Sequence, residues 1–174
     1  GLSRLDATIS NGRRNSSATI FLNPALKRDN IKLQKNILVE KIVLENDRAG
    51  GIEVCEKGQK YRIEAEKEII LSAGALNSPQ ILMLSGIGPA DHLRNIGSNV
   101  SHDLPGVGQN LQDHATVSIS WECLKEFEAH KIDRPINKMM AGIKWILTRK
   151  GLAASNHFEA GGLIRGNDNV KYPN

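Results

Sequence analysis

The chain has 174 residues, enough for one domain with a core, and 40% of them are hydrophobic and 24% charged. This balance excludes a disordered chain, which would be poorer in apolar residues and higher in net charge. Because aromatic residues make up only 4%, a core must be built mainly from Ile, Leu, Val and Ala. The net charge of +4 is spread over segments that also carry acidic residues, which favours a mixed solvated surface over a nucleic-acid-binding face.

Membrane, metal and targeting signals are weak in this sequence. It has no run of about 18 apolar residues, so no membrane span is predicted, and the first residues do not resemble a signal peptide. Cys55 and Cys123 are far apart and form no CxxC, so neither a disulfide framework nor a metal site is predicted. Asn-x-Ser triplets at Asn15 and Asn99 leave secretion open. A first residue other than Met, and ends without turn or cap signals, predict an internal fragment.

In chain order, the first element predicted after a loop and a short apolar run is a set of strands. Alternating and β-branched runs predict strands at residues 31–33, 37–44, 51–54 and 61–65. The turn-prone pairs Asn46-Asp47 and Lys57-Gly58 separate the last three of these strands. The expected arrangement is an antiparallel meander.

The next segment predicts a strand followed by a helix. Residues 68–73 have consecutive apolar side chains, which is typical of a strand buried on both faces inside an α/β sheet. Ser78 as N-cap and Pro79 at the first helical position predict a buried helix that ends near Gly86.

The remaining elements are shorter or farther along the chain. A second helix is predicted over residues 89–96 with Gly97 as its stop, and residues 104–114 are a loop rich in Gly, Asn and Gln. Residues 116–121 alternate as a strand, and apolar residues at helical spacing predict a helix over residues 136–147. A domain boundary is expected near residue 115.

Residues 74–88 carry the strongest chemical signal. The pattern places a Gly turn after a buried strand and before a helix N-terminus, where free N–H groups and the helix dipole suit a phosphate or the polar edge of a cofactor. The same arrangement is also common in α/β folds as plain packing. The physics of this stretch alone leaves both interpretations open.

The same stretch resembles the second signature of the glucose-methanol-choline (GMC) oxidoreductases. In that signature a small residue follows Gly, and Ser-Pro, two aliphatic residues and Ser-Gly-aliphatic-Gly come after it, and this sequence matches every fixed position. Residues 12–22, 39–44 and 104–114 resemble the same family in the same order. The resemblance covers roughly residues 12–114 and is strongest to insect glucose dehydrogenase-like members.

The resemblance implies a mixed α/β (α+β) fold. Residues 1–114 would form a partial FAD-binding domain of the glutathione reductase type that includes the meander, and residues 115–174 would begin a substrate-binding domain. It also implies that the backbone of Val39 meets the adenine ring of FAD, although Val39 could equally be an ordinary strand core residue. Ala73 and Gly74 would lie close to the dinucleotide, where a bulky side chain would not fit.

Two family features are missing from the sequence. No Gly-x-Gly-x-x-Gly phosphate loop is present, since residues 106–108 lack the third Gly and the following helix. The catalytic His motif that relatives place near the end of a longer chain has no match in residues 115–174. The five histidines are expected in surface or loop roles: His92, His102, His114, His130 and His157. No catalytic residue and no metal ligand is therefore predicted here, and His114 is expected to help order a loop between the domains.

The implied function is that of an FAD-dependent oxidoreductase acting on the CH–OH group of a small-molecule alcohol or sugar, with the fragment itself inactive. A flavin-containing hydroxynitrile lyase of the same family and a non-catalytic flavin-binding remnant are the alternatives, and a nucleic-acid-binding module is a distant one. The sequence leaves the substrate, the electron acceptor, the oligomeric state and the compartment open.

Overall fold

The computed structural model describes residues 2–119, 121, 124, 134–155, 160–165, 169 and 171. Its contacts group into two compact units, which are described separately. The meander unit comprises Leu33–Ser118, and the terminal unit comprises Gly1–Lys32 together with Ile119–Asn174. The expected division into a cofactor domain over residues 1–114 and a substrate domain over residues 115–174 stays a prediction, because compactness does not tell which ligand a segment serves.

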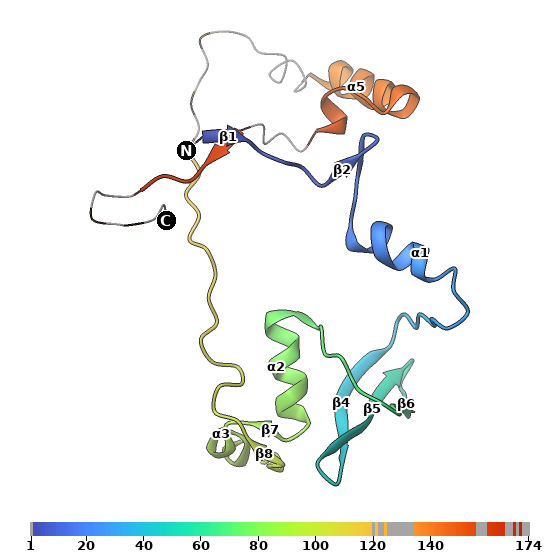
Figure 1. Cartoon of the computed structure of the whole chain (residues 1–174), viewed down its shortest axis with the longest axis vertical. Coiled ribbons are helices and arrows are strands. Elements are labelled where there is room, and N and C mark those ends of the chain that lie inside the picture. Colours follow the sequence, from blue (N-terminus) through green and yellow to red (C-terminus); the bar gives the residue numbers. More distant parts are fainter. Residues whose placement is uncertain are drawn as a thin grey trace. The chain divides into compact units, whose positions relative to one another are not determined.

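The meander unit is built on a three-stranded antiparallel sheet (Figure 1). Its strands are β4 (Leu38–Glu45), β5 (Arg48–Glu56) and β6 (Gln59–Glu64), in that spatial order. Both hairpins turn on two left-handed residues, with φ of 48° and 63° at Asn46-Asp47 and of 50° and 82° at Lys57-Gly58. Such turns match the twist of the flanking strands. The predicted meander is confirmed, except that residues 31–33 form no strand, since so short a run finds no partner strand in the described chain.

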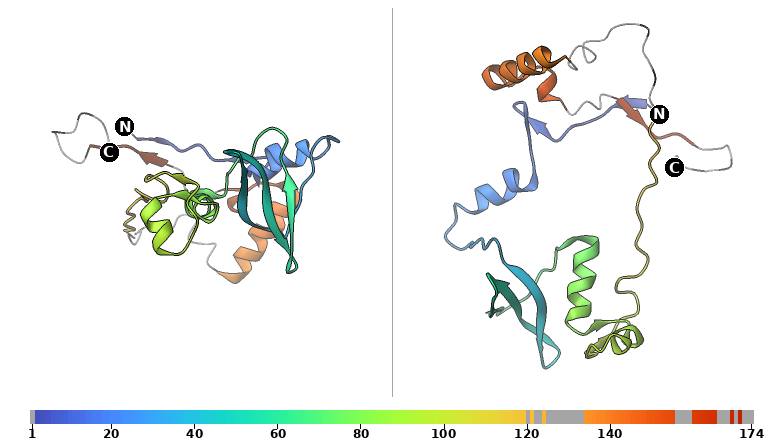
Figure 2. Two further views of the ribbon diagram at one scale, coloured as in Figure 1. Left: turned by 90° about the horizontal axis from the view of Figure 1, so that it is seen from below. Right: turned by 180° about the vertical axis from the view of Figure 1, so that it is seen from behind.

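Strand β4 is an edge strand with an irregular register. Val39 pairs with Val54 and Lys41 with Glu53, so Glu40 is the extra residue of a β-bulge. The outer edge of β4 lies beside helix α2 (Gly74–Leu84), as Figure 1 and the rear view in Figure 2 both show. There the backbone N–H of Ile42 donates to Ser85 Oγ at 2.8 Å, and that hydroxyl donates to the carbonyl of Ile81 at 2.6 Å.

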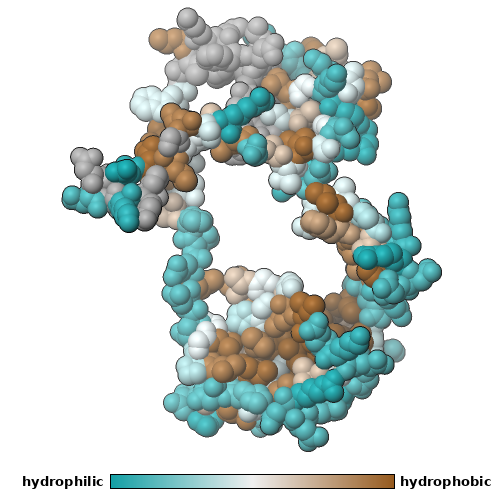
Figure 3. All heavy atoms as spheres, viewed as in Figure 1, coloured by the Kyte–Doolittle hydropathy of each residue, from teal (hydrophilic) through white to brown (hydrophobic). Residues whose placement is uncertain are grey.

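The prediction for the start of α2 was wrong. The helix begins at Gly74, and Pro79 lies inside it. Gly74 has a φ of 88°, which lets the chain turn into the helix directly after Ala73, and Ser78 Oγ accepts the N–H of Ala73 at 3.0 Å instead of capping the helix at its own position. The expected burial is also wrong within this chain: no residue of α2 is fully buried, because only one side of the helix meets β4. Figure 3 shows hydrophobic side chains gathered over α2.

Residues 68–73 do not form the predicted strand. Ile70 is 79% exposed, and no strand of the described chain pairs with this segment. A strand buried on both faces needs neighbouring strands for its hydrogen bonds and helices for its side chains, and this chain supplies neither here. The consecutive apolar residues are present, but the described part of the chain holds no sheet that they could enter.

The second half of the signature, which ends at Gly88, packs against the segment that follows it. Strand β7 (Ile87–Gly88) pairs in parallel with β8 (His102–Asp103), and helix α3 (Ala90–Asn95) confirms the predicted helix. Asp103 Oδ1 accepts the N–H of Ala90 at 3.0 Å, and Leu93 is fully buried. A Cβ on Gly86 would lie 2.8 Å from the carbonyl oxygen of Asn99. This close approach and a φ of 81° require a glycine at position 86.

Within its described residues, the terminal unit contains two short strand pairs and three kinds of helix. Strand β1 (Leu2–Arg4) pairs with β9 (Ala160–Gly162), and β2 (Ile9–Ser10) with β3 (Arg13–Arg14), both antiparallel. The helical segments are the π-helix η1 (Ala18–Leu22), the short α1 (Asn23–Ala25), α5 (Pro135–Thr148) and the 3₁₀ turn η2 (Leu152–Ala154).

Two sequence predictions fall on the terminal unit and the segment that leads to it. Helix α5 is confirmed, with Arg149 in the left-handed conformation at its C-cap. The strand expected over residues 116–121 is wrong for the described residues, since residues 116–119 and Trp121 form none and Val117 is 84% exposed. An alternating pattern needs a partner strand to become a strand, and no described strand lies beside this one.

Helix α5 contacts the turn of the β2–β3 hairpin through its tryptophan side chain. Trp145 Nε1 donates to the carbonyl oxygen of Gly12 at 2.6 Å, and the Arg149 guanidinium lies 4.2 Å from the centre of the Trp145 ring as a cation–π contact. A Cβ on Gly12 would lie 1.9 Å from the carbonyl oxygen of Arg149. A glycine is therefore required at position 12 both by the close approach of the Arg149 carbonyl and by the φ of 66°.

We expect Gly12→Ala to destabilise the terminal unit more than Gly58→Ala destabilises the meander. Gly58 also has a positive φ, but a Cβ there meets nothing within 4 Å, so its substitution costs only the left-handed strain, about 1–2 kcal/mol. Gly12→Ala adds an overlap worth about 1–3 kcal/mol. Thermal unfolding of the intact protein, followed by calorimetry, measures the difference. Equal losses in the two variants would show that the hairpin turn does not hold α5.

Candidate functional site

A pocket of about 650 Å³ lies between β4 and α2 in the meander unit. Its apolar walls come from Leu38, Val39, Ala73, Ile81 and Leu84. A volume of this size suits a small-molecule or cofactor fragment, and apolar walls with a few polar groups are typical of such sites.

Two of the three predicted cofactor residues line this pocket. Val39 and Ala73 are far apart in sequence and meet because α2 packs beside β4. Val39 is half-buried and pairs with the fully buried Val54, so it serves the sheet and the pocket wall together. Gly74 follows Ala73 and is exposed; a Cβ there would meet nothing within 4 Å, so the chain requires this glycine only for its φ of 88°. The contact of these residues with a dinucleotide stays a prediction.

The bulge in β4 shapes the pocket. In a regular strand, successive side chains point to opposite faces, so only alternate residues can line one cavity. Here residues 38–41 line the pocket consecutively, because the extra residue Glu40 breaks the alternation. The outer strand edge and its side chains thus face the same cavity.

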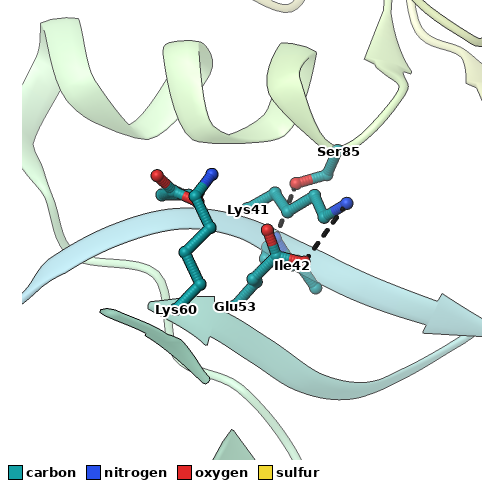
Figure 4. Close-up of polar contacts among 6 residues, drawn as sticks. Lys41, Ile42, Glu53, Lys60 and Ser85 are labelled. Atoms are coloured by element: carbon teal, nitrogen blue, oxygen red, sulfur yellow. Dashed lines mark hydrogen bonds and ion pairs between the residues drawn. The ribbon is translucent and has the colours of Figure 1, made fainter. Parts of the chain in front are cut away.

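Two ion pairs border the pocket. Lys60 Nζ lies 2.7 Å from Glu40 Oε2, and Lys41 Nζ lies 3.4 Å from Glu53 Oε2. Figure 4 shows Lys41, Glu53 and Lys60 on the side of the strands that faces α2. The hydrogen bond from its ammonium group to Glu40 raises the pKa of Lys60 above its ordinary value of 10.5. The four charges cancel, so this border is electrically neutral overall.

The Glu40–Lys60 pair crosses the middle strand. Lys60 on β6 is opposite Cys55 on β5, and Cys55 is opposite Leu38 on β4. Reaching Glu40 therefore requires the two side chains together to span about 10 Å, or two strand spacings. This geometry explains why sequence reasoning missed Lys60, because only the strand register shows that it reaches β4.

Asn77 and Gln80 supply the remaining polar lining. They are three positions apart on α2 and so lie on one face of the helix, toward the pocket. Within the described chain neither carboxamide has a hydrogen-bond partner in the protein. Sequence reasoning missed both residues, although they lie inside residues 74–88; their spacing was the available signal.

Among the described residues, the histidines and the remaining acidic groups build no second site. His92 and His114 are exposed, and His102 Nε2 lies 3.5 Å from Asp47 Oδ1 at the surface, while His130 and His157 lie outside the described residues. In the described part of the chain no group of His, Cys, Asp and Glu side chains could hold a metal ion. Likewise, no helix among those residues has the length and apolar character to cross a membrane.

The comparison with protein families decides the assignment. The model of the GMC oxidoreductase family matches residues 1–116. The chain belongs to the GMC oxidoreductase family. The resemblance found in residues 12–114 is thereby confirmed.

Individual relatives agree with the family. The chain is 44% identical to the mitochondrial choline dehydrogenase of Homo sapiens over 173 residues, which is 99% of this chain and 29% of that protein. It is 42% identical to the oxygen-dependent choline dehydrogenase of Staphylococcus xylosus, over 100% of this chain and 31% of that protein. An FAD-dependent oxidoreductase from Chaetomium thermophilum has a similar structure, with a TM-score of 0.86 and 26% identity, over 94% of this chain and 30% of that one.

The family match and the similar structures identify the fold and the cofactor of this GMC chain. The fold is a partial FAD-binding domain, as predicted, and FAD is the cofactor. The chain spans about a third of the length of the curated relatives it matches. Both of these relatives are choline dehydrogenases, so they support the family but not the finer likeness to insect glucose dehydrogenases.

The ion pair at the pocket border predicts a pH effect. A lysine whose pKa is raised on folding stabilises the folded state below its ordinary pKa of 10.5 and loses this contribution as the pH rises through the higher folded value. We expect Glu40→Gln to return the pKa of Lys60 toward 10.5, since the main cause of the shift is removed. An NMR titration of the Lys60 ammonium group measures this, with the exposed Glu66→Gln as the control. An unchanged Lys60 pKa in Glu40→Gln would contradict the pairing.

Proposed function

We propose that the protein containing this chain is an FAD-dependent oxidoreductase that oxidises the CH–OH group of a small alcohol, and that the pocket between β4 and α2 holds the adenosine end of the cofactor. The observation that carries this proposal is the meeting of Val39 and Ala73 in one pocket. Residues implied separately by the family resemblance thus line a single cavity of suitable size.

The residues present fit a nucleoside better than a phosphate. The walls are apolar, as the faces of a base require, and the outer edge of β4 offers backbone groups to a polar base edge. The charged groups at the border are already paired with one another. No cation of this pocket is left over to neutralise a diphosphate, so its contribution is base binding.

In the proposed enzyme the roles of this chain are binding and orientation. Bound FAD supplies the chemistry of accepting two electrons from the alcohol, and the protein supplies position and electrostatics. Val39 would hold the base through its main chain, and Ala73 would keep the wall flat because it carries only a methyl group. Proton removal from the alcohol would require a base, and no pocket-lining side chain is placed for that task, since each titratable one is ion-paired.

Among alcohols, we favour choline over a sugar. Relatives named as choline dehydrogenases are 42% and 44% identical to this chain, whereas the likeness to glucose dehydrogenases rests on the general character of the sequence. A hydroxynitrile lyase and a non-catalytic flavin-binding remnant remain the alternatives, because both would keep the same cofactor pocket.

Secretion stays a prediction. Of the two glycosylation sequons, Asn99 is exposed and Asn15 is half-buried.

Anaerobic reduction of the intact flavoprotein tests the reaction. Choline should bleach the flavin absorbance because two electrons pass from the alcohol to FAD, and glucose should leave it unchanged. Bleaching by glucose alone would make the protein a sugar dehydrogenase. A flavin that no alcohol reduces would favour the lyase, tested by cyanide release from a cyanohydrin, and the absence of both reactions would leave the binding remnant.

The pocket itself is tested by filling it. Ala73→Leu should lower the FAD content of the purified protein several-fold, since the larger side chain occupies space proposed for the cofactor. Ala75→Leu is the matched control: it makes the same change two positions further along the chain, in the first turn of α2, and Ala75 does not line this pocket. The ratio of flavin absorbance to protein absorbance measures occupancy. Equal flavin contents in the two variants would move the adenosine site elsewhere.

A further inference from the structure

We infer that the side-chain carboxamides of Asn77 and Gln80 recognise the edge of the adenine base and so set the specificity of the pocket for adenine; this inference rests on the proposed function. Both residues line the same pocket as Val39, on the helix that forms the opposite wall. They are the uncharged polar side chains of its lining. While one polar edge of the base meets the backbone of β4, the edge that carries N7 and the 6-amino group would face α2.

The two carboxamides are available for a ligand. Neither side chain has a hydrogen-bond partner among the described residues, and both residues are exposed. The charged side chains nearby are not available in the same way, because Glu40 is bound to Lys60 and Lys41 to Glu53. A ligand that enters the pocket therefore meets two amides as its free hydrogen-bonding side chains.

The chemistry of an amide matches an adenine edge. A carboxamide presents one carbonyl acceptor and one NH₂ donor side by side. Adenine presents the 6-amino donor next to a ring-nitrogen acceptor, and Asn and Gln form paired hydrogen bonds with this edge where proteins recognise adenine in DNA. An uncharged base edge is also what the neutral border allows.

The flavin ring fits this pocket less well than adenine. The reacting ring must lie beside a group that takes the proton of the alcohol. The titratable side chains of this lining are Glu40, Lys41, Glu53 and Lys60, and each is held in an ion pair. The pocket offers hydrogen bonding without proton transfer, as a site for adenine requires.

The test compares two ligands that differ only in the 6-amino group. The intact protein is freed of flavin, and calorimetry measures the Kd of ADP and of purine riboside 5′-diphosphate, which lacks that group. We expect the wild type to bind ADP about tenfold more tightly, and the double variant Asn77→Leu/Gln80→Met to reduce this ratio several-fold, with the main-chain contact of Val39 unchanged. Asn95→Leu and Gln59→Met, made at exposed positions outside the pocket, should keep the tenfold ratio.

The ratio separates recognition from stability. A variant that only destabilises the fold weakens the binding of both ligands equally and leaves the ratio of their Kd values unchanged. An unchanged ratio therefore overturns the inference. If the double variant does not fold, the two single variants are compared in the same way. Binding of FMN in place of ADP at this pocket overturns it as well, because the flavin ring would then be the occupant. A wild type that binds no FAD overturns the proposed function itself, whereas FAD binding with an unchanged ratio overturns the inference alone.

Discussion

The free edge of β4 is the constraint on which the meander unit depends. An edge strand presents unpaired backbone groups, and a buried one must find partners because an unsatisfied N–H costs about 1–3 kcal/mol. Ile42 is only 8% exposed, and Ser85 at the end of α2 accepts its N–H. This single hydrogen bond joins the helix to the strand edge. Because Ser85 also donates to Ile81, its hydroxyl orientation is fixed.

The pocket follows from that attachment. The contact with Ser85 holds the C-terminal end of α2 against β4, while Gly74 starts the helix at the other end, so the cavity opens along the helix between the two. The bulge at Glu40 then places consecutive side chains in this space. One signature therefore does two things: its first half lines the pocket through Asn77 and Gln80, and its second half packs the chain that follows.

Local rules predicted what depends on local contacts. The meander could be predicted because Asn46-Asp47 and Lys57-Gly58 specify tight turns by themselves, and α5 because its apolar spacing and its stop are local. The strand at residues 68–73 could not, since it depends on partner strands that the described chain lacks. In the site, the family resemblance predicted the positions of Val39 and Ala73. The role of Lys60 could not be predicted, because it depends on a strand register altered by a bulge that no sequence pattern indicates.

The charge balance of the pocket explains how the chain can be basic and yet bind a base rather than a phosphate. Its net charge is +4, but the two lysines at the pocket are neutralised by Glu40 and Glu53. The sequence also lacks the Gly-x-Gly-x-x-Gly loop whose backbone groups bind pyrophosphate. On the proposed function, the diphosphate of FAD would therefore be bound by parts of the protein other than this pocket. Affinity for the cofactor would then be divided between phosphate binding elsewhere and base recognition here, so a change at Asn77 or Gln80 would alter which nucleotide is bound without removing the attraction for phosphate.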